Sequence, residues 1–253
     1  MVKRARAWDI STGGLPGPVP KAFLLAALLL AGTGSAAVAA GATCGGAAVQ
    51  TEVPRGTPYS DRLADKAAVL PPDTRALIFG DSDAGRWPAD QLDHLFGTPV
   101  LNFAQGGDRF ENTRWMIDQV DAPAARAVSS VVVMVGSNSV NRDDPCSLEA
   151  KARDLLRSLK PRFPAARVYF VNILQKGRVE GRMSDRVLAA NDVLRELSAE
   201  FGLTYVDVHG AFAAECGEAT DCPLFAEDRV HPSAAGFDLM SRVLARALQP
   251  KPG

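Results

Sequence analysis

The sequence predicts an α/β protein in which five parallel strands form one doubly wound sheet between two layers of helices. Two observations support this prediction. Five short apolar segments rich in β-forming residues recur along the chain, and amphipathic helical patterns lie between them. Strands that alternate with helices favour a parallel sheet, and right-handed crossovers place helices on both of its faces. We therefore expect a three-layer α/β/α sandwich.

The expected strands are short and bounded by polar or turn-forming residues. In chain order they are 76–79, 100–103, 131–135, 168–171 and 203–206. The third is the most pronounced, because it consists of four valines and one methionine. Three sets of apolar residues at helical spacing follow. These sets are Leu148, Ala152, Leu155, Leu156 and Leu159; Leu188, Val193, Leu194 and Leu197; and Phe237, Met240, Val243, Leu244 and Leu248.

The composition suits one globular domain preceded by a leader. The chain has 253 residues, of which 47% are hydrophobic, and a formal net charge of −1. This charge argues against a nucleic-acid partner, which requires a basic face. We expect a signal peptide or membrane anchor over residues 1–42, a flexible Gly-, Pro- and Thr-rich linker over 43–72, and the folded domain over 73–250.

Residues 1–42 have the features of an export signal. The basic segment Lys3-Arg4-Ala5-Arg6 precedes an apolar stretch at 23–42, and small residues including Ala37-Val38-Ala39 fill its second half. That stretch is also long enough to span a bilayer, so membrane attachment through residues 23–42 is the alternative. We expect an exported protein, periplasmic or secreted.

The four cysteines fit an oxidising compartment. Cys216 and Cys222 bracket a short polar loop, so we expect a disulfide between them. Cys44 and Cys146 remain as a second pair, and four unpaired cysteines are the alternative. No group of cysteines and histidines has the spacing of metal ligands, and we expect no metal or other cofactor.

Residues with catalytic potential follow the first three expected strands. Ser82 comes after the first strand, Gly107 after the second and Asn138 after the third. The carboxyl ends of parallel strands meet at one edge of the sheet, where ligands bind. Ser82 is therefore a candidate nucleophile, and the Gly107 amide and Asn138 side chain are candidate oxyanion donors. Ordinary turns at the ends of strands are the alternative for each motif.

Asp228 and His231 are the candidate partners of the nucleophile. Their spacing allows the carboxylate to hold the imidazole, which can then take the serine proton. His209 is the competing base, although Asp207, its nearest aspartate, is expected to point along a strand. His94 falls in a helical region, where a solvated or packed histidine is expected.

Together and in this order, the motifs resemble the four sequence blocks of the SGNH (GDSL-type) hydrolase superfamily, over residues 74–249. The matching residues are Gly80-Asp81-Ser82, Gly107, Gly136-x-Asn138 and Asp228-x-x-His231. Segments 101–108, 131–138 and 208–212 resemble the platelet-activating-factor acetylhydrolase catalytic subunits and their bacterial relatives. The chain departs from the pattern at Asp83, Ala104 and Ser139. Of these, Asp83 is expected to affect substrate preference, because it follows the nucleophile.

The resemblance implies a flavodoxin-like SGNH hydrolase fold and a serine esterase. No long insertion that could form a lid separates the motifs, so we expect small acyl groups such as acetyl. The resemblance also implies Ser82 as nucleophile, His231 as base and Asp228 as its partner. The oxyanion hole would comprise the amides of Ser82 and Gly107 and the side chain of Asn138. The implied substrate is a small-molecule or glycan ester, on envelope carbohydrate or lipid. An O-acyltransferase and a catalytically silent binding module of the same fold are the alternatives.

Overall fold

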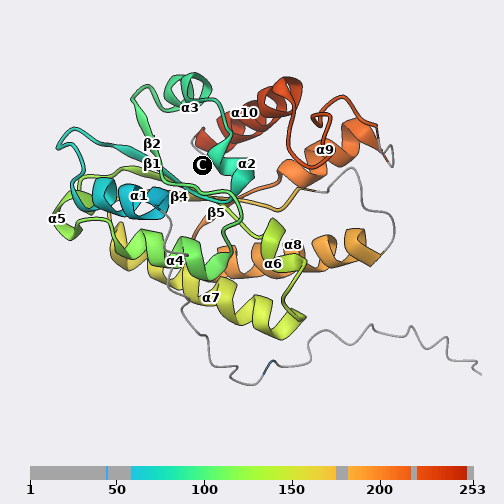
Figure 1. The fold of residues 1–253 in the computed structure, drawn as a ribbon, viewed down its shortest axis with the longest axis horizontal. Helices are drawn as coiled ribbons and strands as arrows, with labels where there is room; N and C mark the ends of the chain where they lie inside the picture. Colours follow the sequence, from blue (N-terminus) through green and yellow to red (C-terminus); the bar gives the residue numbers. More distant parts are fainter. Residues whose placement is uncertain (1–43, 45–57, 175–181, 218–220, 250–253) are drawn as a thin grey trace, which may run out of the picture. The chain divides into compact units, whose positions relative to one another are not determined.

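The computed structural model describes residue 44 and residues 58–174, 182–217 and 221–249. Five parallel strands form one sheet in the order β2-β1-β3-β4-β5 (Figure 1). The strands are β1 (Ala76–Gly80), β2 (Val100–Asn102), β3 (Ser130–Met134), β4 (Arg167–Val171) and β5 (Thr204–Val206). The expected doubly wound parallel sheet is therefore confirmed, with the strand order of flavodoxin-like folds.

Helices cover both faces of this sheet. The helices are α1 (Pro58–Ala68), α2 (Ser82–Gly85), α3 (Ala89–Phe96), α4 (Phe110–Asp118), α5 (Ala122–Ala125), α6 (Ser137–Val140), α7 (Pro145–Arg162), α8 (Arg182–Glu200), α9 (Val208–Cys216) and α10 (Ala234–Leu248). In Figure 1, α3 and α10 lie on one side of the strands, and α1, α4, α7 and α8 lie on the other. The three layers match the expected sandwich.

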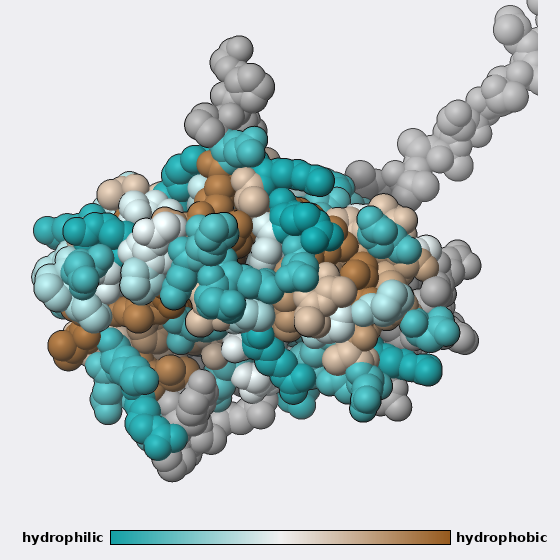
Figure 2. All heavy atoms as spheres, turned by 90° about the horizontal axis from the view of Figure 1, so that it is seen from above, coloured by the Kyte–Doolittle hydropathy of each residue, from teal (hydrophilic) through white to brown (hydrophobic). Residues whose placement is uncertain are grey.

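Two hydrophobic clusters hold the layers together, one on each face of the sheet. Neighbouring strand residues alternate between them: Val131 and Val133 pack with α4, α7 and α8, whereas Val132 packs with α3, α9 and α10. Because both faces are covered, the strands are apolar on both sides, which is why they read as continuous hydrophobic runs. Figure 2 views the molecule from the α3 and α10 side, where hydrophilic side chains cover much of the surface.

The order of the strands determines where a site can form. The chain passes from β1 to β2 on one side and then crosses to β3 on the other side of β1. The carboxyl ends of β1 and β3 therefore lie at the point where the connections diverge. In doubly wound sheets, ligands bind at this topological switch point.

The expectation of a flexible linker over 43–72 is wrong for its second half. Residues 58–68 form α1, and Leu63, Ala67 and Leu70 are buried in the cluster under α4 and α7. These three residues have the i, i+4, i+7 spacing of a helical face. The helix was not predicted because this apolar stripe is short and most of the residues around it are polar. The expected leader, residues 1–42, lies outside the described residues.

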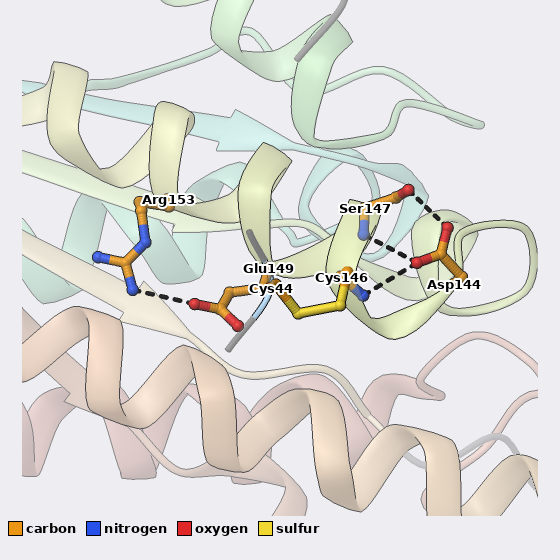
Figure 3. Close-up of a disulfide and its surroundings, with 6 residues drawn as sticks. All are labelled: Cys44, Asp144, Cys146, Ser147, Glu149 and Arg153. Carbon is orange, nitrogen blue, oxygen red and sulfur yellow. Dashed lines mark hydrogen bonds and ion pairs between the residues drawn. A yellow bond between two sulfur atoms is a disulfide. The ribbon is translucent and has the colours of Figure 1, made fainter. Parts of the chain in front are cut away.

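Two disulfides are present, Cys44–Cys146 and Cys216–Cys222, as the sequence suggested. Figure 3 shows Cys44 joined to Cys146 in the first turn of α7, where the Asp144 carboxylate caps the helix through the Cys146 and Ser147 amides. Disulfides are typical of proteins outside the cytoplasm, so these two indicate an extracellular or periplasmic location. Within the described ranges, no helix has the length and apolar character needed to span a bilayer; residues 23–42 are not among them.

The two disulfides should differ in their contribution to stability. Cys44 and Cys146 are 102 residues apart, whereas Cys216 and Cys222 are 6 apart. In the chain-entropy model, losing the first cross-link costs about 4–5 kcal/mol and losing the second about 2 kcal/mol. Urea unfolding of the Cys44→Ser/Cys146→Ser and Cys216→Ser/Cys222→Ser variants measures both losses without leaving a free thiol. Equal losses, or a larger loss in the second variant, would contradict this expectation.

Candidate active site

Ser82 is the first residue of α2, and Asp81 alone separates it from the end of β1. The side chain of Asp81 caps this short helix by accepting a hydrogen bond from the Asp83 amide. The Asp81 amide donates to the Met134 carbonyl at the end of β3, at 3.1 Å. These contacts fix the backbone on both sides of Ser82, so its hydroxyl is held at the switch point.

Two glycines allow the close backbone approach at this edge. Gly80 has φ 149°, and a Cβ atom there would lie 1.8 Å from the Met134 carbonyl oxygen. Gly136 has φ 137°, and its Cβ would lie 2.6 Å from the Ile173 side chain. Both backbone conformations strongly favour glycine. The structure therefore explains why glycine occupies position 80, at the end of β1, and position 136, after β3.

Ser82, His231 and Asp228 form a continuous hydrogen-bonded chain. His231 Nε2 lies 2.8 Å from Ser82 Oγ, and His231 Nδ1 lies 2.6 Å from Asp228 Oδ2. The other carboxylate oxygen, Oδ1, accepts hydrogen bonds from the backbone amides of Val230 and His231, both at 2.9 Å. The pKa of Asp228 is held well below its usual value, chiefly by the hydrogen bond from the His231 amide. The hydrogen bonds from the His231 side chain and from the Val230 amide lower this pKa further. Asp228 is therefore a carboxylate at neutral pH.

The loop that carries this pair is fixed by its own backbone. Residues Phe225 and Pro232 form an isolated antiparallel bridge, and the Ala226 amide donates to the His231 carbonyl at 2.9 Å. Immediately afterwards, Ser233 caps α10 by accepting from the Gly236 amide. His231 is thus anchored between a closed turn and the start of a long helix.

The two other predicted residues lie beside Ser82. The Gly106–Gly107 turn is close to the nucleophile, since a Cβ on Gly106 would lie 3.7 Å from the Ser82 Cβ. Asn138 lies on α6 and donates through Nδ2 to the carbonyl of Asp108, at 2.9 Å. A primary amide has two N–H donors, and this bond uses one of them. The structure therefore brings the five predicted site residues, from four separate segments, to one edge of the sheet.

His209 and His94 occupy different surroundings. His209 is buried at the start of α9, where its backbone amide donates to Asn172 Oδ1. Burial lowers the pKa of its side chain, so it is neutral at neutral pH. His94 is exposed on α3. Within the described part of the chain, neither histidine forms a hydrogen bond with Ser82.

Asp83 has a structural role in addition to its expected effect on substrate preference, which stays a prediction. Its side chain is buried and accepts a hydrogen bond from Ser137 Oγ at 3.2 Å. It therefore ties α2, which begins with the nucleophile, to α6, which carries Asn138. A buried carboxylate held in this way is a structural link between the two helices, and this position explains the departure from the apolar residue of the family pattern.

Sequence reasoning did not identify Arg86 as a neighbour of the site. This half-exposed side chain places Nη1 3.5 Å from Asp228 Oδ2. The two residues are 142 positions apart, so no local pattern connects them. The described residues include no group of three or more His, Cys, Asp or Glu side chains arranged to hold a metal ion.

Comparison with known proteins identifies the family of the chain. A family model described as the GDSL-like Lipase/Acylhydrolase family matches residues 71–239. A search of curated proteins found no match.

Solved structures with the same fold include several bacterial proteins. One from Streptococcus pneumonia, named for platelet activating factor, is 18% identical with a TM-score of 0.63, over 76% of this chain and 91% of its own. A GDSL-like lipase from Bacteroides thetaiotaomicron is 16% identical with a TM-score of 0.61, over 74% and 96%. An acetylxylan esterase from Geobacillus stearothermophilus is 20% identical with a TM-score of 0.57, over 71% and 95%. At these identities the likeness establishes the fold.

Proposed function

Because the chain belongs to the GDSL-like lipase/acylhydrolase family and is an ester-bond hydrolase, we propose that it is a serine esterase that removes small acyl groups, chiefly acetyl. The observation that carries the proposal is the unbroken hydrogen-bonded chain from Asp228 through His231 to Ser82. A nucleophile, a base and a group that orients the base are the three parts that acyl transfer to serine requires.

In the proposed mechanism, Ser82 Oγ attacks the ester carbonyl while His231 Nε2 takes its proton. Asp228 remains ionised and stabilises the imidazolium that forms. The amides of Ser82 and Gly107 and the side chain of Asn138 donate hydrogen bonds to the oxyanion. His231 then protonates the departing alcohol, which leaves an acyl-enzyme. Water, deprotonated by the same histidine, attacks this ester, and proton return to Ser82 releases the acid.

For the substrate, we propose an acetyl ester on an envelope carbohydrate or on another small molecule. One neighbour of the same fold is named as an acetylxylan esterase, which makes an acetylated glycan a reasonable first candidate. Two disulfides fit an enzyme that works outside the cytoplasm. We further propose that residues 1–42 direct export and that 23–42 attach the protein to a membrane if they are not removed. No nucleic-acid partner is proposed.

Comparing kcat/KM for acetyl, butyryl and palmitoyl p-nitrophenyl esters tests the acyl preference, and we expect acetyl to be preferred. A preference for palmitoyl would contradict a small-acyl site.

Acetyl release from an acetylated xylo-oligosaccharide, measured with and without a second glycan acceptor, separates hydrolysis from acyl transfer. Labelling with a fluorophosphonate, with Ser82→Ala as the control, identifies the nucleophile, and absence of labelling would indicate a silent binding module.

A further inference from the structure

A network of buried charges lies between α4, α6 and α7. Lys151 Nζ is 3.1 Å from Glu111 Oε1 and 2.8 Å from Asp143 Oδ1. Arg109 Nη1 is 3.2 Å from the same Glu111 oxygen. The Glu111 side chain is 0% exposed and that of Asp143 is 8% exposed. Charges this far from solvent require close partners. Lys151 is a partner of both carboxylates, and Glu111 shares it with Arg109.

The network joins the two segments that carry the proposed oxyanion donors. Glu111 is in the first turn of α4, soon after Gly107, and Asp143 follows α6, which carries Asn138. Lys151 comes from α7, which holds none of the proposed site residues and lies beside α4 on the same face of the sheet (Figure 1). One ammonium group on a long helix therefore connects both segments.

Direct hydrogen bonds between described residues also join these segments. Asn138 Nδ2 donates to the Asp108 carbonyl at 2.9 Å, and the Phe110 amide lies 3.4 Å from Ser139 Oγ. The second distance is long for an N–H donor. The ion network adds charged contacts to this connection.

We propose that Lys151 is a positioning residue that fixes the Gly107 turn relative to Asn138, and so sets the geometry of the oxyanion hole. The inference rests on the proposed function, in which these two groups hold the oxyanion. Among the described residues, Lys151 donates hydrogen bonds to Glu111 and Asp143 and not to Ser82. It acts through Glu111 on one segment and through Asp143 on the other.

The charge of Lys151 is suited to this role. Burial lowers the pKa of its ammonium group, but the hydrogen bonds that this group donates to Asp143 and Glu111 more than offset the effect, so the net pKa is raised above its usual value. The group is therefore charged at neutral pH. Without it, two buried carboxylates would face each other with less compensation, and their repulsion would move the segments apart. A displacement of about 1 Å at a catalytic group costs roughly 10²-fold in rate.

Lys151→Met tests the proposal. We expect kcat for p-nitrophenyl acetate to fall by roughly 10- to 100-fold, while KM changes less than about threefold because the oxyanion forms only in the transition state. Lys151→Arg, which keeps the charge, should restore most of kcat. A Lys151→Met enzyme that is folded and has near-normal kcat would overturn the proposal. So would Lys151→Arg with kcat as low as that of Lys151→Met.

Controls separate positioning from stability. Arg153 lies on the same helix and forms ion pairs with Glu149 and Glu200, away from the site. The kcat of Arg153→Met should therefore equal that of the wild type. If Lys151→Met does not fold, Asp143→Asn replaces it, since this variant keeps the Lys151–Glu111 pair and should still lower kcat. Asp143→Asn that folds with unchanged kcat would then overturn the proposal.

A double-variant comparison locates the effect. If Lys151 acts through the oxyanion hole, Lys151→Met should lower kcat less in the Asn138→Ala background than in the wild type, because contacts that work together are not additive. Equal effects in both backgrounds would contradict the inference. A different variant tests the proposed function itself. If Ser82→Ala retains wild-type esterase activity, the proposed function is wrong, whatever the Lys151 variants show.

Discussion

The His231→Ala variant should lose about 10⁶-fold in kcat for an acetyl ester, the loss that follows removal of the base from a serine hydrolase triad. The reason is geometric. His231 Nε2 lies 2.8 Å from Ser82 Oγ and is the group in position to take its proton. Without it, the hydroxyl must react as a weak neutral nucleophile. Steady-state kinetics measures the loss, and circular dichroism shows whether the variant is folded.

His209→Ala is the matched control. His209 follows β5 and has an aspartate, Asp207, close by in the sequence, so it was the competing candidate for the role of base. In the structure, however, its ring is buried at the start of α9, and the Asp207 carboxylate is engaged with Asn172 and the Gly210 amide. We expect this variant to retain most of its kcat. Loss of activity in His209→Ala with activity retained in His231→Ala would transfer the role of base to His209.

The sequence predicted the sheet because its strands are covered on both faces. A strand such as β3 has buried residues on both sides, so it appears as an unbroken run of valines that needs no long-range information. The candidate site residues were predicted from the same alternation of strands and helices. Ser82, Gly107 and Asn138 each come after a strand, and the carboxyl ends of parallel strands share one edge.

Features that depend on partners far apart in the sequence could not be predicted in this way. Lys151 is a lysine on an amphipathic helix, and nothing near it in the sequence indicates that Glu111 and Asp143 will surround it. Asp83 was identified as unusual, but its bond with Ser137 spans 54 positions. Helix α1 was missed for another reason: its apolar stripe is short, and the polar residues around it resemble a linker.

Asn138→Ala should reduce kcat by about 10²–10³-fold, or roughly 3–4 kcal/mol of transition-state stabilisation, which is the usual effect of losing one oxyanion donor. KM should change little, because the bond to the oxyanion strengthens only as the carbonyl becomes tetrahedral. Kinetics with p-nitrophenyl acetate measures both quantities. Near-normal kcat in a folded Asn138→Ala enzyme would remove this side chain from the oxyanion hole.

The interpretation of that result requires a second asparagine, because Asn138 also donates to the Asp108 carbonyl. Asn141 lies at the end of the same helix, and its Nδ2 donates to the Ser137 carbonyl at 3.1 Å. Asn141→Ala therefore removes a local bond of the same kind but no proposed oxyanion donor, and its kcat should stay within about threefold of the wild type. If both variants lose activity equally, the loss comes from the position of α6. If only Asn138→Ala loses activity, the loss belongs to the amide that faces the developing charge.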